Sequence, residues 1–149
     1  MRRIHRIFLD TSVIFAAVLL ETGGARKLFR LGEASMLQVI VGPNVLRECE
    51  DVVRRKVPAS LPTLAYLLEL GMVEITAESP DAFIERAKTI VAYEPDAHVL
   101  AEAMGAEPDW FITHDKAHFL SADPGSSLAF FIGTPGDLIQ SLEDEFTQS

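Results

Sequence analysis

Short apolar runs that alternate with helical patterns constrain the fold of this chain more than any other feature. Each run has the length and the β-branched or aromatic content of a buried strand. Strands are expected at residues 4–9, 37–41, 72–76, 110–113 and 127–132. Strands that alternate with helices imply right-handed crossovers and a mostly parallel sheet with helices on both faces. We therefore predict an α/β fold, a three-layer α/β/α sandwich.

The segments between these runs carry a 3.6-residue apolar period or helix-start signals. Helices are expected directly after Asp10 and at residues 25–34, 43–53, 61–70, 79–91, 95–105 and 134–146. The hydroxyl of Thr11 or Ser12 would cap the first helix. With 149 residues and no linker-like tract, the chain suits a single domain, 1–149.

Charge is distributed unevenly along the chain. The 22 acidic and 13 basic residues give a net charge of −9, yet ten of the basic residues fall in the first 60 positions. A polyanion would therefore have to meet the basic half, with metal ions offsetting clustered carboxylates. The single cysteine fits a reducing cytosol, and no apolar run approaches the ~20 residues that span a bilayer. We expect a cytoplasmic protein without a membrane segment.

Acidic residues stand at the positions where a parallel sheet places its ligand crevice. Asp10 and Asp115 each follow a predicted strand, and ligands bind outside the carboxyl ends of such strands. Asp96 falls inside the apolar arc of its helix, where an unpaired charge is costly. Glu48 and Glu50 lie on opposite margins of the apolar arc of theirs, and periodicity does not choose between them.

Each of these acids also has a purely structural interpretation. Asp10 could be a turn residue, Asp96 a helix cap, Asp115 the start of a loop, and Glu48 a solvated helix residue. Together, however, they would converge on one crevice, where like charges raise each other's pKa unless a cation lies between them. Oxygen-only ligands favour a hard ion, so the predicted cofactor is Mg²⁺ or Mn²⁺.

Four segments resemble the sequence motifs of the PIN-domain family and occur in the same order. They are residues 7–13 (IFLDTSV), 43–48 (PNVLRE), 96–103 (DAHVLAEA) and 109–116 (DWFITHDK). The first resembles the strand that ends in Asp-Thr-Ser, the second the helix that presents a Glu, and the last a strand ending in Thr-x-Asp. The resemblance covers most of residues 4–132 and selects Glu48 over Glu50.

The resemblance implies a three-layer fold and metal-dependent cleavage of RNA, often by the toxin of a VapBC-type toxin–antitoxin pair. It implies in-line attack of water on a phosphodiester, leaving a 5′-phosphate and a 3′-hydroxyl. The implied catalytic carboxylates are Asp10, Glu48, Asp96 and Asp115, and the implied orienting hydroxyls belong to Thr11, Ser12 and Thr113. Asp10, Asp96 and Asp115 would bind the metal, with Glu48 and His118 as further candidates.

One departure from the family concerns the metal. Many members carry another acid where this chain has His118, so the number of ions stays open. A zinc site involving His98, His114 and His118 is a minor alternative, although their spacing fits no strong zinc pattern.

The sequence also predicts binding partners. RNA and an acidic antitoxin segment are the expected partners of the basic side chains, with contacts assigned to Arg26, Lys27, Arg30, Arg47 and Lys116. A homodimer is expected, with the apolar helix at 61–70 supplying the surface.

Two other functions remain open from the sequence. The chain could be a non-catalytic PIN-like module that binds nucleic acid or protein. It could also be a phosphoryl-transfer domain of the receiver or phosphatase type that uses Asp10, although the second acid expected of a phosphatase is replaced by Ser12.

Overall fold

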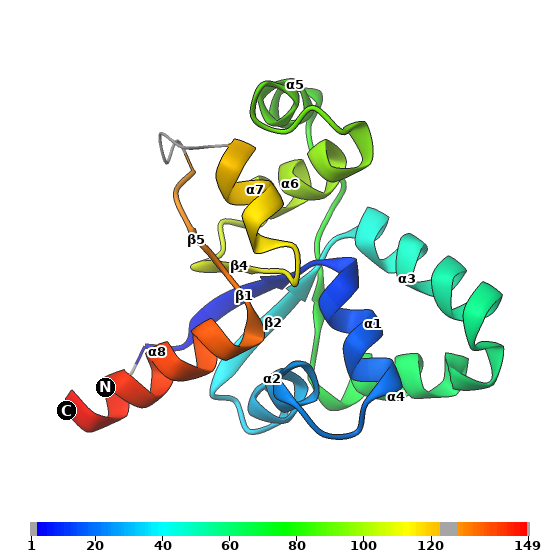
Figure 1. Cartoon of the computed structure of the whole chain (residues 1–149), viewed down its shortest axis with the longest axis vertical. Coiled ribbons are helices and arrows are strands. Elements are labelled where there is room, and N and C mark those ends of the chain that lie inside the picture. Colours follow the sequence, from blue (N-terminus) through cyan, green and yellow to red (C-terminus); the bar gives the residue numbers. More distant parts are fainter. Residues whose placement is uncertain (1–2, 123–127, 149) are drawn as a thin grey trace.

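Five parallel strands form one twisted sheet at the centre of the molecule (Figure 1). The computed structural model describes residues 3–122 and 128–148. The strands are β1 (His5–Leu9), β2 (Leu37–Val41), β3 (Glu74–Ile75), β4 (Trp110–Ile112) and β5 (Phe131–Gly133). Their order across the sheet is β3-β2-β1-β4-β5, and every neighbouring pair is parallel. The predicted α/β class is confirmed.

Helices join these strands and cover the sheet. They are α1 (Thr11–Leu19), α2 (Gly24–Glu33), α3 (Pro43–Lys56), α4 (Leu61–Leu70), α5 (Asp81–Ile90), α6 (Glu94–Ala106), α7 (Lys116–Ala122) and α8 (Pro135–Gln148), with a 3₁₀ turn at Pro58–Ser60. Figure 1 places α5, α6 and α7 above the sheet and α1 to α4 to its right and below it. None of the described helices has the length and apolar character needed to cross a membrane.

The connections run in two directions from the middle of the sheet. The chain steps from β1 to β2 and β3 toward one edge, then returns across the sheet to β4 and β5. Right-handed connections in opposite directions place their helices on opposite faces. β1 and β4 are neighbours whose outgoing connections diverge, and in such sheets ligands bind outside the carboxyl ends of these strands.

The core lies on both faces of the two central strands. Ile7, Phe8 and Leu9 are consecutive and all fully buried, as expected for a parallel strand covered on both sides. The Phe8 ring stacks on Phe111 of β4 with a centroid separation of 5.8 Å. This packing fixes the carboxyl ends of β1 and β4 side by side.

Three local predictions were wrong. Asp10, not Thr11 or Ser12, is the N-cap of α1, because its Oδ1 accepts the N–H of Thr11 at 2.8 Å. Helix α7 forms after Asp115, where no helix was expected, because seven residues are too few to display a clear period. The last strand is Phe131–Gly133; residues 128–130 of the predicted range form bends, and Ser127 lies outside the described residues.

Candidate active site

Asp10 forms the centre of the candidate site, at the carboxyl end of β1. Besides the N–H of Thr11, it accepts two hydroxyls at Oδ2, from Ser12 at 3.2 Å and from Thr113 at 2.8 Å. Burial raises the pKa of Asp10 above its ordinary value, the bonds from Thr113, Thr11 and Ser12 oppose the rise, and the charge of Asp115 adds to it. Asp10 is therefore a carboxylate held in one orientation in a site that penalises its charge.

Thr113 links Asp10 to Asp115. Its side chain is fully buried; Oγ1 donates to Asp10 and accepts the N–H of Asp115 at 2.9 Å. A second hydrogen bond links the same two turns, since Ser12 Oγ accepts the N–H of His114 at 3.1 Å. These bonds join the turn after β1 to the turn after β4, so the two aspartates have a fixed relation to one another.

Asp96 reaches the same region from the first turn of α6. Its side chain is 29% exposed, and its Oδ2 lies 2.9 Å from Nε2 of His118 on α7. Burial raises the pKa of Asp96, the charge of His118 lowers it, and Asp10 and Asp115 raise it further. Three aspartates from three different connections therefore lie within electrostatic reach of one another.

The structure separates Glu48 from Glu50, which the helical pattern did not. Glu48 is exposed, yet partial burial of its carboxyl group raises its pKa, the Thr11 hydroxyl lowers it, and the charges of Asp10 and Asp96 raise it further. Glu50 instead lines a hollow beside α4 together with Arg54. Thr11 Oγ1, buried at the start of α1, lies next to the Glu48 carboxylate. The carboxylate that α3 offers to the aspartates is that of Glu48.

The chemistry of this donor set suits a hard divalent cation. Asp10, Asp96, Asp115 and Glu48 supply only oxygen ligands, and three of them have pKa values raised by burial and by each other's charge. Within residues 3–122 and 128–148, however, no three His, Cys, Asp or Glu side chains converge closely enough to hold an ion. An ion at Asp96 would also compete with His118 for Oδ2.

The histidines considered for zinc do not gather with one another. His98 faces Glu94 at 3.6 Å on its own helix, and His114 is exposed. Only His118 contacts one of the site carboxylates among the described contacts of these three residues. The arrangement offers no support for the zinc alternative.

The predicted basic contacts fall into two groups. Arg26 and Arg30 donate to backbone carbonyls in and just after the last turns of α1, at 2.7 and 3.1 Å, and so fasten the connection between α1 and α2. Lys27 is exposed on α2. Arg47 is exposed next to Glu48, and Lys116 lies next to Asp115 but pairs with a carboxylate at the start of α8 at 2.9 Å. Arg47 and Lys116 are therefore the two that adjoin predicted site acids in sequence, and the Arg47 guanidinium donates to Oδ1 of Asn44 at 2.6 Å.

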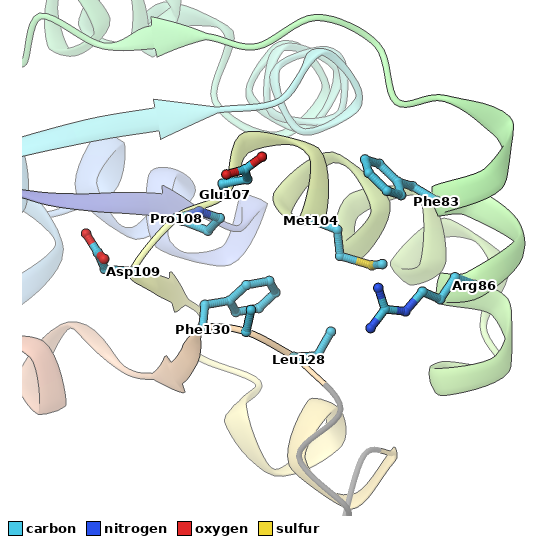
Figure 2. Close-up of a pocket in the computed structure, with 9 residues that line it drawn as sticks. Phe83, Arg86, Met104, Glu107, Pro108, Asp109, Leu128 and Phe130 are labelled. Atoms are coloured by element: carbon cyan, nitrogen blue, oxygen red, sulfur yellow. The ribbon is translucent and has the colours of Figure 1, made fainter.

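A separate hollow of about 420 Å³ lies at the opposite end of the sheet (Figure 2). Phe83 and Arg86 of α5, Met104 of α6 and Phe130 face it, and Asp109 at the amino end of β4 forms part of its border. None of the predicted site residues lines it. The candidate active site is thus the group of acidic residues at the carboxyl ends of β1 and β4, away from this hollow.

Comparisons with known proteins agree with this architecture. The family model described as "PIN domain" matches residues 6–117. The crystal structure of VapBC2 from Rickettsia felis, bound to a DNA fragment from its promoter, superposes with a TM-score of 0.67 at 13% identity; the match covers 86% of this chain and 98% of that chain. At that identity the likeness concerns the fold alone. No curated protein is similar enough in sequence to be counted as a relative.

Proposed function

The chain belongs to the PIN-domain family, and from this premise we propose that it is a divalent-metal-dependent ribonuclease that hydrolyses phosphodiester bonds of RNA. PIN domains are generally nucleases, so the coarse activity follows from the family. The observation that carries the finer proposal is the meeting of Asp10, Asp96 and Glu48, each with a raised pKa, in one region. Such a concentration of perturbed acids is typical of functional sites.

A bound Mg²⁺ or Mn²⁺ would supply the positive charge that offsets charge developing on the phosphoryl oxygens. Asp10, Asp96 and Asp115 would hold it, with Glu48 as a further ligand. Thr113 would keep Asp10 and Asp115 in their relative orientation through its two hydrogen bonds. Such outer hydroxyls fix the direction in which a carboxylate offers its lone pairs.

The substrate would enter across the exposed side of this group of acidic residues. Arg47 and Lys116 are next to Glu48 and Asp115 in sequence and would contact phosphates on either side of the cleaved bond. Asp137 pairs with Lys116 in the free protein, so RNA would have to compete with that carboxylate. His118, paired with Asp96, would be displaced or become a ligand when the ion binds.

Toxin status, an antitoxin partner, a homodimer and a cytoplasmic location are part of the same proposal. The VapBC2 assembly that resembles this chain in fold supports an antitoxin partner. α4 is a candidate dimer surface, because Tyr66 on that helix is 57% exposed. A monomer mass in solution at micromolar concentration would contradict the dimer.

The alternative is a non-catalytic PIN-like binding module. One observation favours it: the acidic side chains do not form a closed ligand shell among the described residues. The receiver-type alternative is disfavoured, because both oxygens of Asp10 already accept hydrogen bonds and Lys116 pairs with Asp137 rather than with Asp10.

Incubation with end-labelled single-stranded RNA and Mn²⁺ separates these two functions. A nuclease yields shortened products with 5′-phosphate ends, and EDTA abolishes them. A binding module retards the RNA on a native gel but leaves it intact in both conditions.

A further inference from the structure

Glu102 is a buried carboxylate that the proposed chemistry does not use. It lies on α6, is 2% exposed, and its Oε2 accepts the N–H of Asn44 at 2.8 Å. Asn44 is in the first turn of α3, whose N-cap Gly42 provides no side-chain bond. A carboxylate of one helix thus takes the place of the missing cap on another, 58 positions away in sequence.

The surroundings of Gly42 are fitted to this carboxylate. A Cβ added to Gly42 would overlap Oε1 and Cδ of Glu102, so only glycine leaves room for the side chain. The same Oε1 is buried without a hydrogen-bond partner among the described residues. Burial raises the pKa of Glu102, and the backbone N–H groups of Asn44 and Val45, the charge of Arg47 and the Asn44 side chain oppose the rise. An arrangement that buries a carboxyl group and leaves one oxygen unpaired costs free energy.

The two helices joined at this point each carry one carboxylate of the site. Glu48 lies one turn beyond Asn44 on α3, and Asp96 lies in the first turn of the helix that carries Glu102. We propose that Glu102 is a positioning residue, which sets the separation of Glu48 from Asp96 by fastening the start of α3 to α6. This inference rests on the proposed function, in which those two acids serve one metal site.

Four variants test the role of Glu102. Glu102→Ala removes the acceptor of the Asn44 N–H, and Gly42→Ala displaces the same carboxylate without altering it. Glu102→Gln keeps an acceptor oxygen for Asn44. Asp109→Ala is the matched control, because it removes another side-chain carboxylate that accepts a backbone N–H, that of Arg6 at 2.8 Å, at the opposite end of the sheet.

Two measurements test this role, one of the distance between α3 and α6 and one of metal affinity. Nitroxide labels on α3 (Arg55→Cys) and α6 (Glu94→Cys) report the interhelical distance in metal-free protein by pulsed electron spin resonance; both positions are exposed, and Cys49 is buried. Calorimetry with Mn²⁺ alone reports the metal affinity. Groups that hold metal ligands in place contribute ~10–100-fold to affinity.

We expect Glu102→Ala and Gly42→Ala to broaden the distance distribution and to weaken Mn²⁺ binding about tenfold, the lower end of that range. Glu102→Gln and Asp109→Ala should keep the wild-type distance and affinity. If Glu102→Ala and Gly42→Ala leave both readouts unchanged, or Asp109→Ala alters them equally, the inference is overturned. A wild type that binds Mn²⁺ but leaves RNA intact would contradict the nuclease and not this inference, since neither readout uses cleavage.

Discussion

Replacing Thr113 with valine isolates the contribution of one hydroxyl to the site. Valine has nearly the same shape, but the variant loses the bond to Asp10 Oδ2 at 2.8 Å and leaves the Asp115 N–H without its acceptor at 2.9 Å. A hydrogen bond to a charged group contributes ~1.5–3 kcal/mol to stability. At ~2–4 °C per kcal/mol for a chain of this size, a loss of ~2 kcal/mol lowers Tm by ~4–8 °C.

The pH dependence of this loss has a definite sign. The Thr113 hydroxyl stabilises the ionised form of Asp10 and so lowers a pKa that burial raises. The stability difference between wild type and Thr113→Val should therefore be full above the folded-state pKa of Asp10 and should shrink as the pH falls through it. Urea unfolding of both proteins in EDTA between pH 3 and 8 measures this difference in stability.

Thr113→Ser is the matched control, because it keeps the hydroxyl and removes only a buried methyl group. We expect Thr113→Val to weaken Mn²⁺ affinity by ~10–100-fold and Thr113→Ser to change it little. If the two variants lose equal stability at all pH values and bind Mn²⁺ equally well, the hydroxyl does not orient Asp10, and the reasoning fails.

Three further predictions follow from the same site and its supports. Asp10→Asn should become progressively more stable than the wild type as the pH rises above the ordinary aspartate pKa of 3.8. Burial raises the folded-state pKa of Asp10, so its ionised form destabilises the fold. Urea midpoints of the two proteins in EDTA that stay parallel from pH 4 to 8 would contradict this. Glu48→Gln should reduce Mn²⁺-dependent RNA cleavage at least tenfold whereas Glu50→Gln should not, and equal effects on the initial rate would refute the assignment made from the charges around Glu48. Thr134→Ala should lower stability by ~1 kcal/mol without altering cleavage, since Thr134 and Asp137 form a reciprocal cap at the start of α8; thermal unfolding that matches the wild type would refute it.

The sequence predicts the central fold well where local and tertiary preferences agree. The run Leu37–Val41, apolar except at Gln38, is β2 as predicted, because a parallel strand covered on both faces is apolar at nearly every position. Helix α4 ends at Leu70 as predicted, directly before Gly71. β3 is shorter than predicted because it is an edge strand, and both of its residues are exposed.

The candidate site is only partly predictable from the sequence. Local periodicity is enough to identify three of the acids: two of them follow predicted strands, and Asp96 lies on the inward side of its helix. The choice of Glu48 over Glu50 depends on how α3 packs against α1 and α6, which no pattern within α3 encodes. The pairing of His118 with Asp96 depends on the short helix α7. Glu102 lies outside the apolar arc of α6, so its burial against Gly42 gives no sequence signal.

The most direct test of the whole account compares RNA cleavage by the wild type and Asp96→Asn across a Mn²⁺ titration. Asp81→Asn is the control, because Asp81 is also in the first turn of a helix but faces solvent on α5. We expect metal-dependent cutting by the wild type and by Asp81→Asn, and its loss in Asp96→Asn. Equal cutting by all three proteins, or intact RNA with the wild type at saturating Mn²⁺, would contradict it.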